Sequence, residues 1–159
     1  MTRTGGYAPR GTRLRADVPH GHWKTTTFVA GLIGRGLIAP MVLDGPMDAA
    51  AFIAYVEQVL AKEVRRGDLV VLDNLSSHKT AGVRAALVRC RIEFLYLPPY
   101  SPDLNPIENA FSKLKRLVRG AGERTIEGLW SALGRLIDQF TPAECRNYIQ
   151  HAGYDATKN

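Results

Sequence analysis

Four consecutive aliphatic residues, Leu69–Leu72, run directly into a carboxylate, Asp73, and this junction constrains the fold more than any other feature. So short an apolar run predicts a strand buried on both faces, as in the sheets of α/β proteins. In an open α/β sheet, ligands bind beyond the carboxyl ends of the strands, and a buried carboxylate there is costly unless it is paired or binds a metal. The structural alternative is an Asp73 that caps the next turn, through Asn74, Ser76 and Ser77. The pattern alone leaves both open.

The rest of the chain predicts an α/β domain that spans residues 1–159, with a mixed sheet and flanking helices. We expect a basic loop with ragged strand over residues 1–22, and C-terminal helices over residues 124–155. Pro40 favours a sheet edge or a bulge, and Trp23 and Trp130 are expected in the core. The pattern predicts strands at 23–32, 37–43, 69–72 and 92–97, and helices at 48–65, 80–89, from 105 onward, 125–140 and from 141 to a stop at Gly153.

Composition narrows the class of protein. Hydrophobic residues make up 45% and charged residues 23% of the 159, as in soluble globular domains, and no apolar stretch is long enough for a membrane helix. The two cysteines, Cys90 and Cys145, match neither a disulfide framework nor a metal-binding spacing, which favours a reducing cytoplasm. The net charge of +6 is concentrated in residues 1–24 and 111–124, each with five cations against one carboxylate. That distribution suits a polyanionic partner.

Glu108 also has two interpretations. If Asn105 is the N-cap and Pro106 the first helical residue, Glu108 is placed to reach back to the Asn105 backbone N–H as a capping-box residue. At 100° per residue, however, Glu108 shares one edge of its helix with Lys115 and Arg119. That edge is either a solvated face or a metal-binding carboxylate followed by cations that track a nucleic-acid backbone.

Two segments, LVVLDN-LSSHK and LPPYSPDLNPIENAFSKLK, resemble the catalytic core of DDE transposases of the mariner-like superfamily, in its bacterial insertion-sequence branch. The 34 residues between Asp73 and Glu108 match the interval between that family's second and third acidic residues, and the upstream GYAPRGTRL fits too. The resemblance implies a ribonuclease H-like fold in which three carboxylates hold two Mg²⁺ or Mn²⁺ ions around a scissile phosphate. It assigns Asp73 and Glu108 as catalytic metal ligands. DNA contacts are expected from the nearby polar residues Asn74, His78, Lys79, Lys113, Lys115 and Arg119.

The first acidic residue of that family lies on a strand shortly before the segment that matches residues 3–14 here. We therefore expect this Asp, its strand and the family's end-recognising helix-turn-helix region to lie outside this chain. Asp17, Asp44 and Asp48 are poor substitutes, with Asp44 the first suspect. An upstream transposase segment or an intact transposase is then an expected partner. Tyr100 is expected to pack near the site, the alternative being a base-stacking role.

Three functions remain in competition. The first is a transposase catalytic domain for metal-dependent DNA strand cleavage and strand transfer, acting on transposon ends and target DNA. The second is a non-catalytic DNA-binding remnant or regulator, which forms mixed oligomers with an active transposase. The third is a host ribonuclease H-like nuclease. For the first we expect a homo-oligomer without membrane association, in the bacterial cytoplasm and at the nucleoid when bound to DNA.

Overall fold

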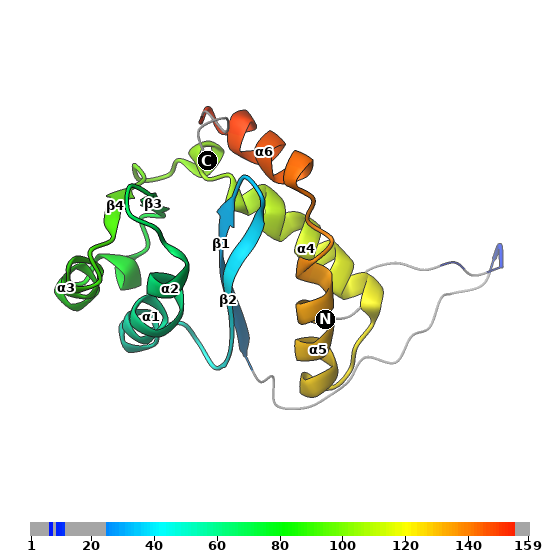
Figure 1. Ribbon diagram of the computed structural model, residues 1–159. Coiled ribbons are helices and arrows are strands. Elements are labelled where there is room, and N and C mark those ends of the chain that lie inside the picture. Colours follow the sequence, from blue (N-terminus) through cyan, green and yellow to red (C-terminus); the bar gives the residue numbers. More distant parts are fainter. Residues whose placement is uncertain (1–6, 8, 12–24, 155–159) are drawn as a thin grey trace.

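The computed structural model describes residues 7, 9–11 and 25–154 of the chain (Figure 1). Most of the basic segment predicted over residues 1–22, with Asp17 and Trp23, lies outside the described residues. The elements, in chain order, are β1 (Thr26–Ile33), β2 (Gly36–Asp44), α1 (Ala49–Tyr55), the π-helical turn η1 (Val56–Leu60), α2 (Ala61–Glu63), β3 (Leu69–Leu72), the 3₁₀ turn η2 (Ser76–Lys79), α3 (Ala81–Arg89), β4 (Glu93–Tyr96), the 3₁₀ turn η3 (Pro102–Leu104), α4 (Ile107–Ala121), α5 (Ile126–Ile137) and α6 (Pro142–His151).

The strands form one antiparallel pair and one parallel pair. β1 pairs with β2 antiparallel, and β3 pairs with β4 parallel, so that Leu72 stands beside Tyr96. The expected mixture of both pairing types is confirmed, but the described strands form two separate two-stranded sheets rather than one continuous sheet. In the hairpin, the register shifts where one residue of β1 faces both Ala39 and Pro40 of β2. The bulge expected at Pro40 is therefore present.

The hairpin separates two hydrophobic cores, because its side chains alternate between its faces. One core contains Val29 and Met41 together with side chains of α1, η1, α3, β3 and β4. The other contains Phe28 and Val42 together with side chains of α4, α5 and α6. Figure 1 shows the same arrangement, with α1 and α3 on one side of the hairpin and α4 and α5 on the other. Each core therefore depends on one face of the same hairpin.

Local capping rules predicted several helix ends correctly. Asp48 caps α1, where its carboxylate accepts a hydrogen bond from the backbone N–H of Ala51 at 2.7 Å. Thr141 caps α6 in the same way, through the N–H of Glu144 at 3.3 Å. Gly153 ends that helix with a φ of +86°, the left-handed conformation that glycine adopts without strain. Among the described residues, no helix is both long enough and apolar enough to cross a membrane.

Two predictions about burial were wrong. Leu69 of β3 is 55% exposed, so the strand is not buried on both faces. Its neighbour on the same uncovered face, Leu95 of β4, is 53% exposed. The cause is one-sided packing: in the described part of the chain, the core covers the opposite face of this strand pair, which carries Val70, Phe94 and Tyr96. Trp130 is 41% exposed on α5 and does not belong to the core.

Candidate active site

A cavity of about 510 Å³ lies where β3, the loop after β4 and the start of α4 meet. Asp73 and Asn74 enter it from the end of β3, and Glu108 enters it from the first turn of α4. The full lining comprises Asp73, Asn74, Leu75, Lys79, Leu97, Pro98, Pro99, Tyr100, Ser101, Pro102, Asn105 and Glu108. The fold thus brings together the two carboxylates that the sequence separates by 34 residues.

Asp73 is held in place by hydrogen bonds to one of its two oxygens. Its Oδ1 lies 2.6 Å from Nδ1 of His78 and accepts a hydrogen bond from the backbone N–H of Leu75 at 3.2 Å. Asp73 does cap the turn after β3, but through Leu75 and His78 rather than through the expected Asn74, Ser76 and Ser77. Burial raises the pKa of Asp73, but the hydrogen bond and charge of His78 and the N–H of Leu75 outweigh it and lower the pKa. The carboxylate is 34% exposed, and its Oδ2 takes no part in these contacts.

His78 is a support for Asp73 in this structure. Its side chain is only 13% exposed, and its ring stacks on Phe52 of α1 with the centroids 4.0 Å apart. The Tyr96 hydroxyl donates a hydrogen bond to the His78 backbone carbonyl at 2.6 Å. His78 does not line the cavity, whereas its neighbour Lys79 does. The position of His78 therefore fits a role in orienting Asp73 better than the DNA contact expected from the sequence.

The capping interpretation of Glu108 was wrong. The helix begins one residue later than expected, with Pro106 as its N-cap and no side-chain hydrogen bond at the cap. The Asn105 backbone N–H, which a capping-box Glu108 would accept from, instead donates to the Pro102 carbonyl within the 3₁₀ turn at 2.9 Å. In the described part of the chain, the Glu108 carboxylate takes part in no hydrogen bond or ion pair. It is exposed at the cavity wall and free to bind a ligand.

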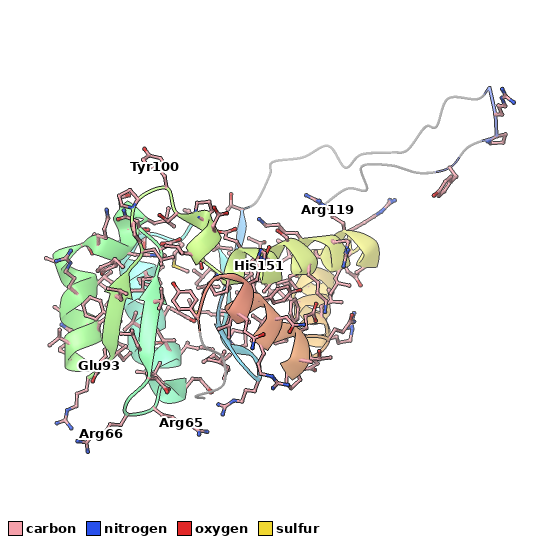
Figure 2. The ribbon with its side chains drawn as sticks, turned by 90° about the horizontal axis from the view of Figure 1, so that it is seen from above. Arg65, Arg66, Glu93, Tyr100, Arg119 and His151 are labelled. Atoms are coloured by element: carbon pink, nitrogen blue, oxygen red, sulfur yellow. The ribbon has the colours of Figure 1, made fainter. Side chains whose placement is uncertain are left out.

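The cations of α4 divide into two groups. Lys115 and Arg119 are exposed on the same edge as Glu108, as the helical phase predicted. Arg119 projects from the surface in Figure 2, toward the same edge of the molecule as Tyr100. Neither cation lines the cavity that holds the carboxylates. Their charge is thus available to a long polyanion that extends beyond the cavity along α4.

Lys113 is engaged inside the protein, which contradicts its expected role in DNA contact. Its ammonium donates to Glu144 Oε2 at 2.5 Å and to the Gln139 carbonyl at 2.9 Å. It also lies 4.5 Å from the centroid of the Phe140 ring. Its side chain is only 17% exposed, so little of the charge faces solvent. Lys113 fastens α4 to α6, and we exclude it from the DNA-binding set.

Glu144 has a second hydrogen-bond partner besides Lys113, and we call the Lys113–Glu144 pair the clasp between α4 and α6. The Tyr148 hydroxyl donates to its Oε1 at 2.6 Å. Burial raises the pKa of Glu144, but the hydrogen bonds and charge of Lys113 and the hydrogen bond of Tyr148 outweigh it and lower the pKa. Burial and the Glu144 carboxylate together raise the pKa of Tyr148 to about 12, so the phenol remains a donor. No pattern in the sequence linked Glu144 to α4.

The donors of the cavity fit a hard divalent cation in chemistry but not in number. Two carboxylates and the Asn74 side-chain amide supply oxygen, the ligand that Mg²⁺ and Mn²⁺ prefer. Among the described residues, no group of three or more His, Cys, Asp or Glu side chains is placed to hold a metal ion. Asp44 and Asp48 therefore do not complete the site, and Asp48 is used as a helix cap.

The chain belongs to the DDE superfamily endonucleases, whose family model matches residues 1–129. It is similar to the Tc1 transposase of Caenorhabditis elegans, with 34% identity over 109 residues that cover 61% of this chain and 39% of the relative. It is also similar to the Tcb1 transposase of Caenorhabditis briggsae, with 29% identity over 93 residues, 52% of this chain and 34% of the relative. The chain thus spans less than half the length of the curated relatives that it matches.

Solved structures confirm the ribonuclease H-like fold predicted from the sequence. The Mos1 strand transfer complex superposes with a TM-score of 0.67 at 18% identity, covering 98% of this chain and 51% of that chain. The Mos1 transposase catalytic domain in complex with raltegravir and Mn superposes with a TM-score of 0.59, also at 18% identity, covering 80% of this chain and 78% of that chain. At this identity the likeness concerns the fold alone.

Proposed function

We propose that this chain supplies the second and third carboxylates of a transposase site that cleaves and joins DNA with Mg²⁺ or Mn²⁺. The observation that carries the proposal is the placement of Asp73 and Glu108 in one cavity, at a strand end and a helix start. The match to the DDE superfamily endonucleases and the similarity to the Tc1 transposase support it. We assign the chain to the bacterial insertion-sequence branch from its motifs, which also implies the bacterial cytoplasm and a homo-oligomer on DNA.

In this mechanism the protein side chains hold and orient the metal ions and the DNA rather than react themselves. Asp73 Oδ2 and the Glu108 carboxylate would hold the metal ions, while His78 and the Leu75 N–H keep Asp73 from turning away. The bound ions supply the activation of a water or a 3′-hydroxyl and offset charge on the leaving oxygen. Lys79, exposed on the cavity wall, is placed to contact a phosphate oxygen. Cleavage and strand transfer then differ only in the nucleophile.

The remaining carboxylate is proposed to arrive on a strand that pairs with β3. One observation supports this addition: among the described residues, β3 has a pairing partner on one edge only. Backbone N–H and C=O groups on an open strand edge are a template for a further strand. An upstream transposase segment, in the same polypeptide or a separate one, would supply it. Lys115 and Arg119 would bind transposon-end and target DNA along α4.

The decisive experiment tests nicking by residues 1–159 with Mn²⁺ on DNA that carries an element end. We expect no nicking by this chain alone, and Mn²⁺-dependent nicking once the upstream segment is joined or co-expressed. Asp73→Asn and Glu108→Gln should each abolish the restored activity. Nicking by 1–159 alone that Asp73→Asn abolishes would show that the site is complete without the upstream segment. No nicking in any combination would overturn the catalytic proposal.

The non-catalytic alternative is favoured by one observation, the shortage of metal ligands in the described part of the chain. It predicts DNA binding without nicking, even when the upstream segment is present. The exposed cations of α4 serve both functions, so binding alone does not separate them. The comparison of nicking with and without the upstream segment does.

A further inference from the structure

Tyr100 is placed unlike any other aromatic residue at the site. It lies at the tip of the loop between β4 and α4 and is fully exposed, so its predicted packing near the site was wrong. Figure 2 shows its side chain projecting away from the body of the molecule, at the edge opposite Arg65, Arg66 and Glu93. An aromatic ring that is fully hydrated in the unbound protein has both faces open to a partner.

The loop holds this exposed ring in a defined position. Pro98, Pro99 and Pro102 surround Tyr100, and each proline fixes its own backbone φ angle. Tyr100 has a φ of +55°, a left-handed conformation that is uncommon for a bulky residue. Strained backbone of this kind persists where its surroundings determine it, and it gathers at ligand-binding sites. The ring is therefore presented outward by a stiff support.

The cavity that Tyr100 helps to line contains both charged and apolar residues. Asp73, Glu108 and Lys79 supply the charged groups, beside which a phosphate and bound cations would lie. Leu97, the prolines of the loop and Leu75, which is 55% exposed, supply apolar surface. A nucleotide combines the same two chemistries, a charged sugar-phosphate and a flat, largely apolar base. The volume of about 510 Å³ leaves room for a single nucleotide.

We propose that Tyr100 is a stacking platform for one unpaired nucleobase of the DNA strand whose phosphate lies at the carboxylates. This inference rests on the proposed function and adds a specific contact to it. In an intact duplex the faces of each base are covered by its neighbours, so the ring of Tyr100 can stack only on a base that is unpaired, terminal or turned out. The contact would fix the strand beside the site and would tolerate any base, because every base has a π face.

The test compares two duplexes that differ in one unpaired 2-aminopurine near the middle, bound by residues 1–159 without metal. Tyr100→Ala should weaken binding of the duplex with the unpaired base by about 5- to 150-fold, the range of one base–aromatic stack. Tyr100→Phe should retain the wild-type affinity, and binding of the fully paired duplex should not change. At saturation, 2-aminopurine emission should be lower with wild type than with Tyr100→Ala, because stacking on the ring quenches it.

A salt titration separates stacking from charge. Tyr100→Ala should leave the slope of log K against log salt unchanged, whereas the double variant Lys115→Ala, Arg119→Ala should reduce it for both duplexes. Equal affinity of wild type and Tyr100→Ala for the unpaired base would overturn the inference while leaving DNA binding intact. An equal loss on both duplexes would also overturn it. Failure of the wild type to bind either duplex would overturn both the inference and the proposed function.

Discussion

Replacing Lys113 by methionine isolates the structural role of its charge. Methionine keeps an unbranched apolar side chain and removes the ammonium that bonds Glu144 and Gln139 and lies over the Phe140 ring. Hydrogen bonds to charged groups contribute about 1.5–3 kcal/mol each when well shielded, and exposed ion pairs contribute about 0–1 kcal/mol. The side chains of Lys113 and Glu144 are 17% and 28% exposed. The contribution of each bond in the clasp therefore lies between the value for a shielded bond and the value for an exposed ion pair. We expect the free energy of unfolding to fall by about 2–3 kcal/mol.

Urea unfolding followed by circular dichroism measures this loss, and a thermal scan should show a Tm lower by roughly 4–12 °C for a chain of this length. Lys115→Met is the matched control, since Lys115 lies on the same helix with an exposed side chain. It should change stability by less than about 0.5 kcal/mol. A double-mutant cycle with Glu144→Gln should show coupling between the two clasp residues.

The same pair of variants separates structure from DNA binding. At a temperature where both are folded, Lys113→Met should keep the wild-type slope of log K against log salt, and Lys115→Met should reduce the slope by up to about 0.9. The reasoning fails if Lys113→Met is no less stable than Lys115→Met, or if Lys113→Met lowers the salt slope as much as Lys115→Met does.

Three further predictions concern positioning, pH and capping. His78→Ala should weaken Mn²⁺ binding by the completed site about 10–100-fold, measured by electron paramagnetic resonance of the free ion, because Asp73 loses the side-chain partner of its Oδ1 and keeps only the Leu75 N–H. Because folding lowers the pKa of Glu144, this residue stabilises the protein above the ordinary carboxyl pKa, and that contribution is lost as pH falls below it. Urea unfolding should therefore show that the free energy of unfolding falls less between pH 7 and pH 3 in Lys113→Met than in wild type. Thr141→Ala should cost about 1 kcal/mol in the same assay, through the lost cap of α6.

Residues governed by nearby sequence were predictable. The end of β3 at Asp73, the cap at Asp48 and the cap at Thr141 each depend on fewer than five consecutive residues, and the structure shows each of them. The exposed edge of α4 also follows from a local rule, the 100° step of the helix. Asp73 and Glu108 could be paired only through the family resemblance, because no local rule connects a strand end to a helix start 34 residues later.

The misjudged residues depend on partners distant in the sequence or on competing local bonds. Lys113 meets Glu144 across 31 positions, and no periodicity connects the two. Glu108 lost its capping role because the 3₁₀ turn before α4 takes the Asn105 N–H. Leu69 is exposed because burial of both faces of a parallel strand requires cover on both, and the described chain covers only the face with Val70 and Phe94. Only the tertiary arrangement decides each of these outcomes.

The clasp at Lys113 also bears on the site, because α4 carries Glu108 in its first turn and Lys113 little more than one turn later. A carboxylate that binds metal must be held to within a fraction of an ångström, and a surface helix alone does not provide that precision. Glu108 has no hydrogen-bond partner of its own among the described residues, so its position depends on the placement of the whole helix. The clasp to α6 and the burial of Leu114 and Val118 fix that placement. The same helix thus carries Lys115 and Arg119 on its exposed edge and Lys113 on the side facing α6, and the bonds of Lys113 help to fix the position of Glu108.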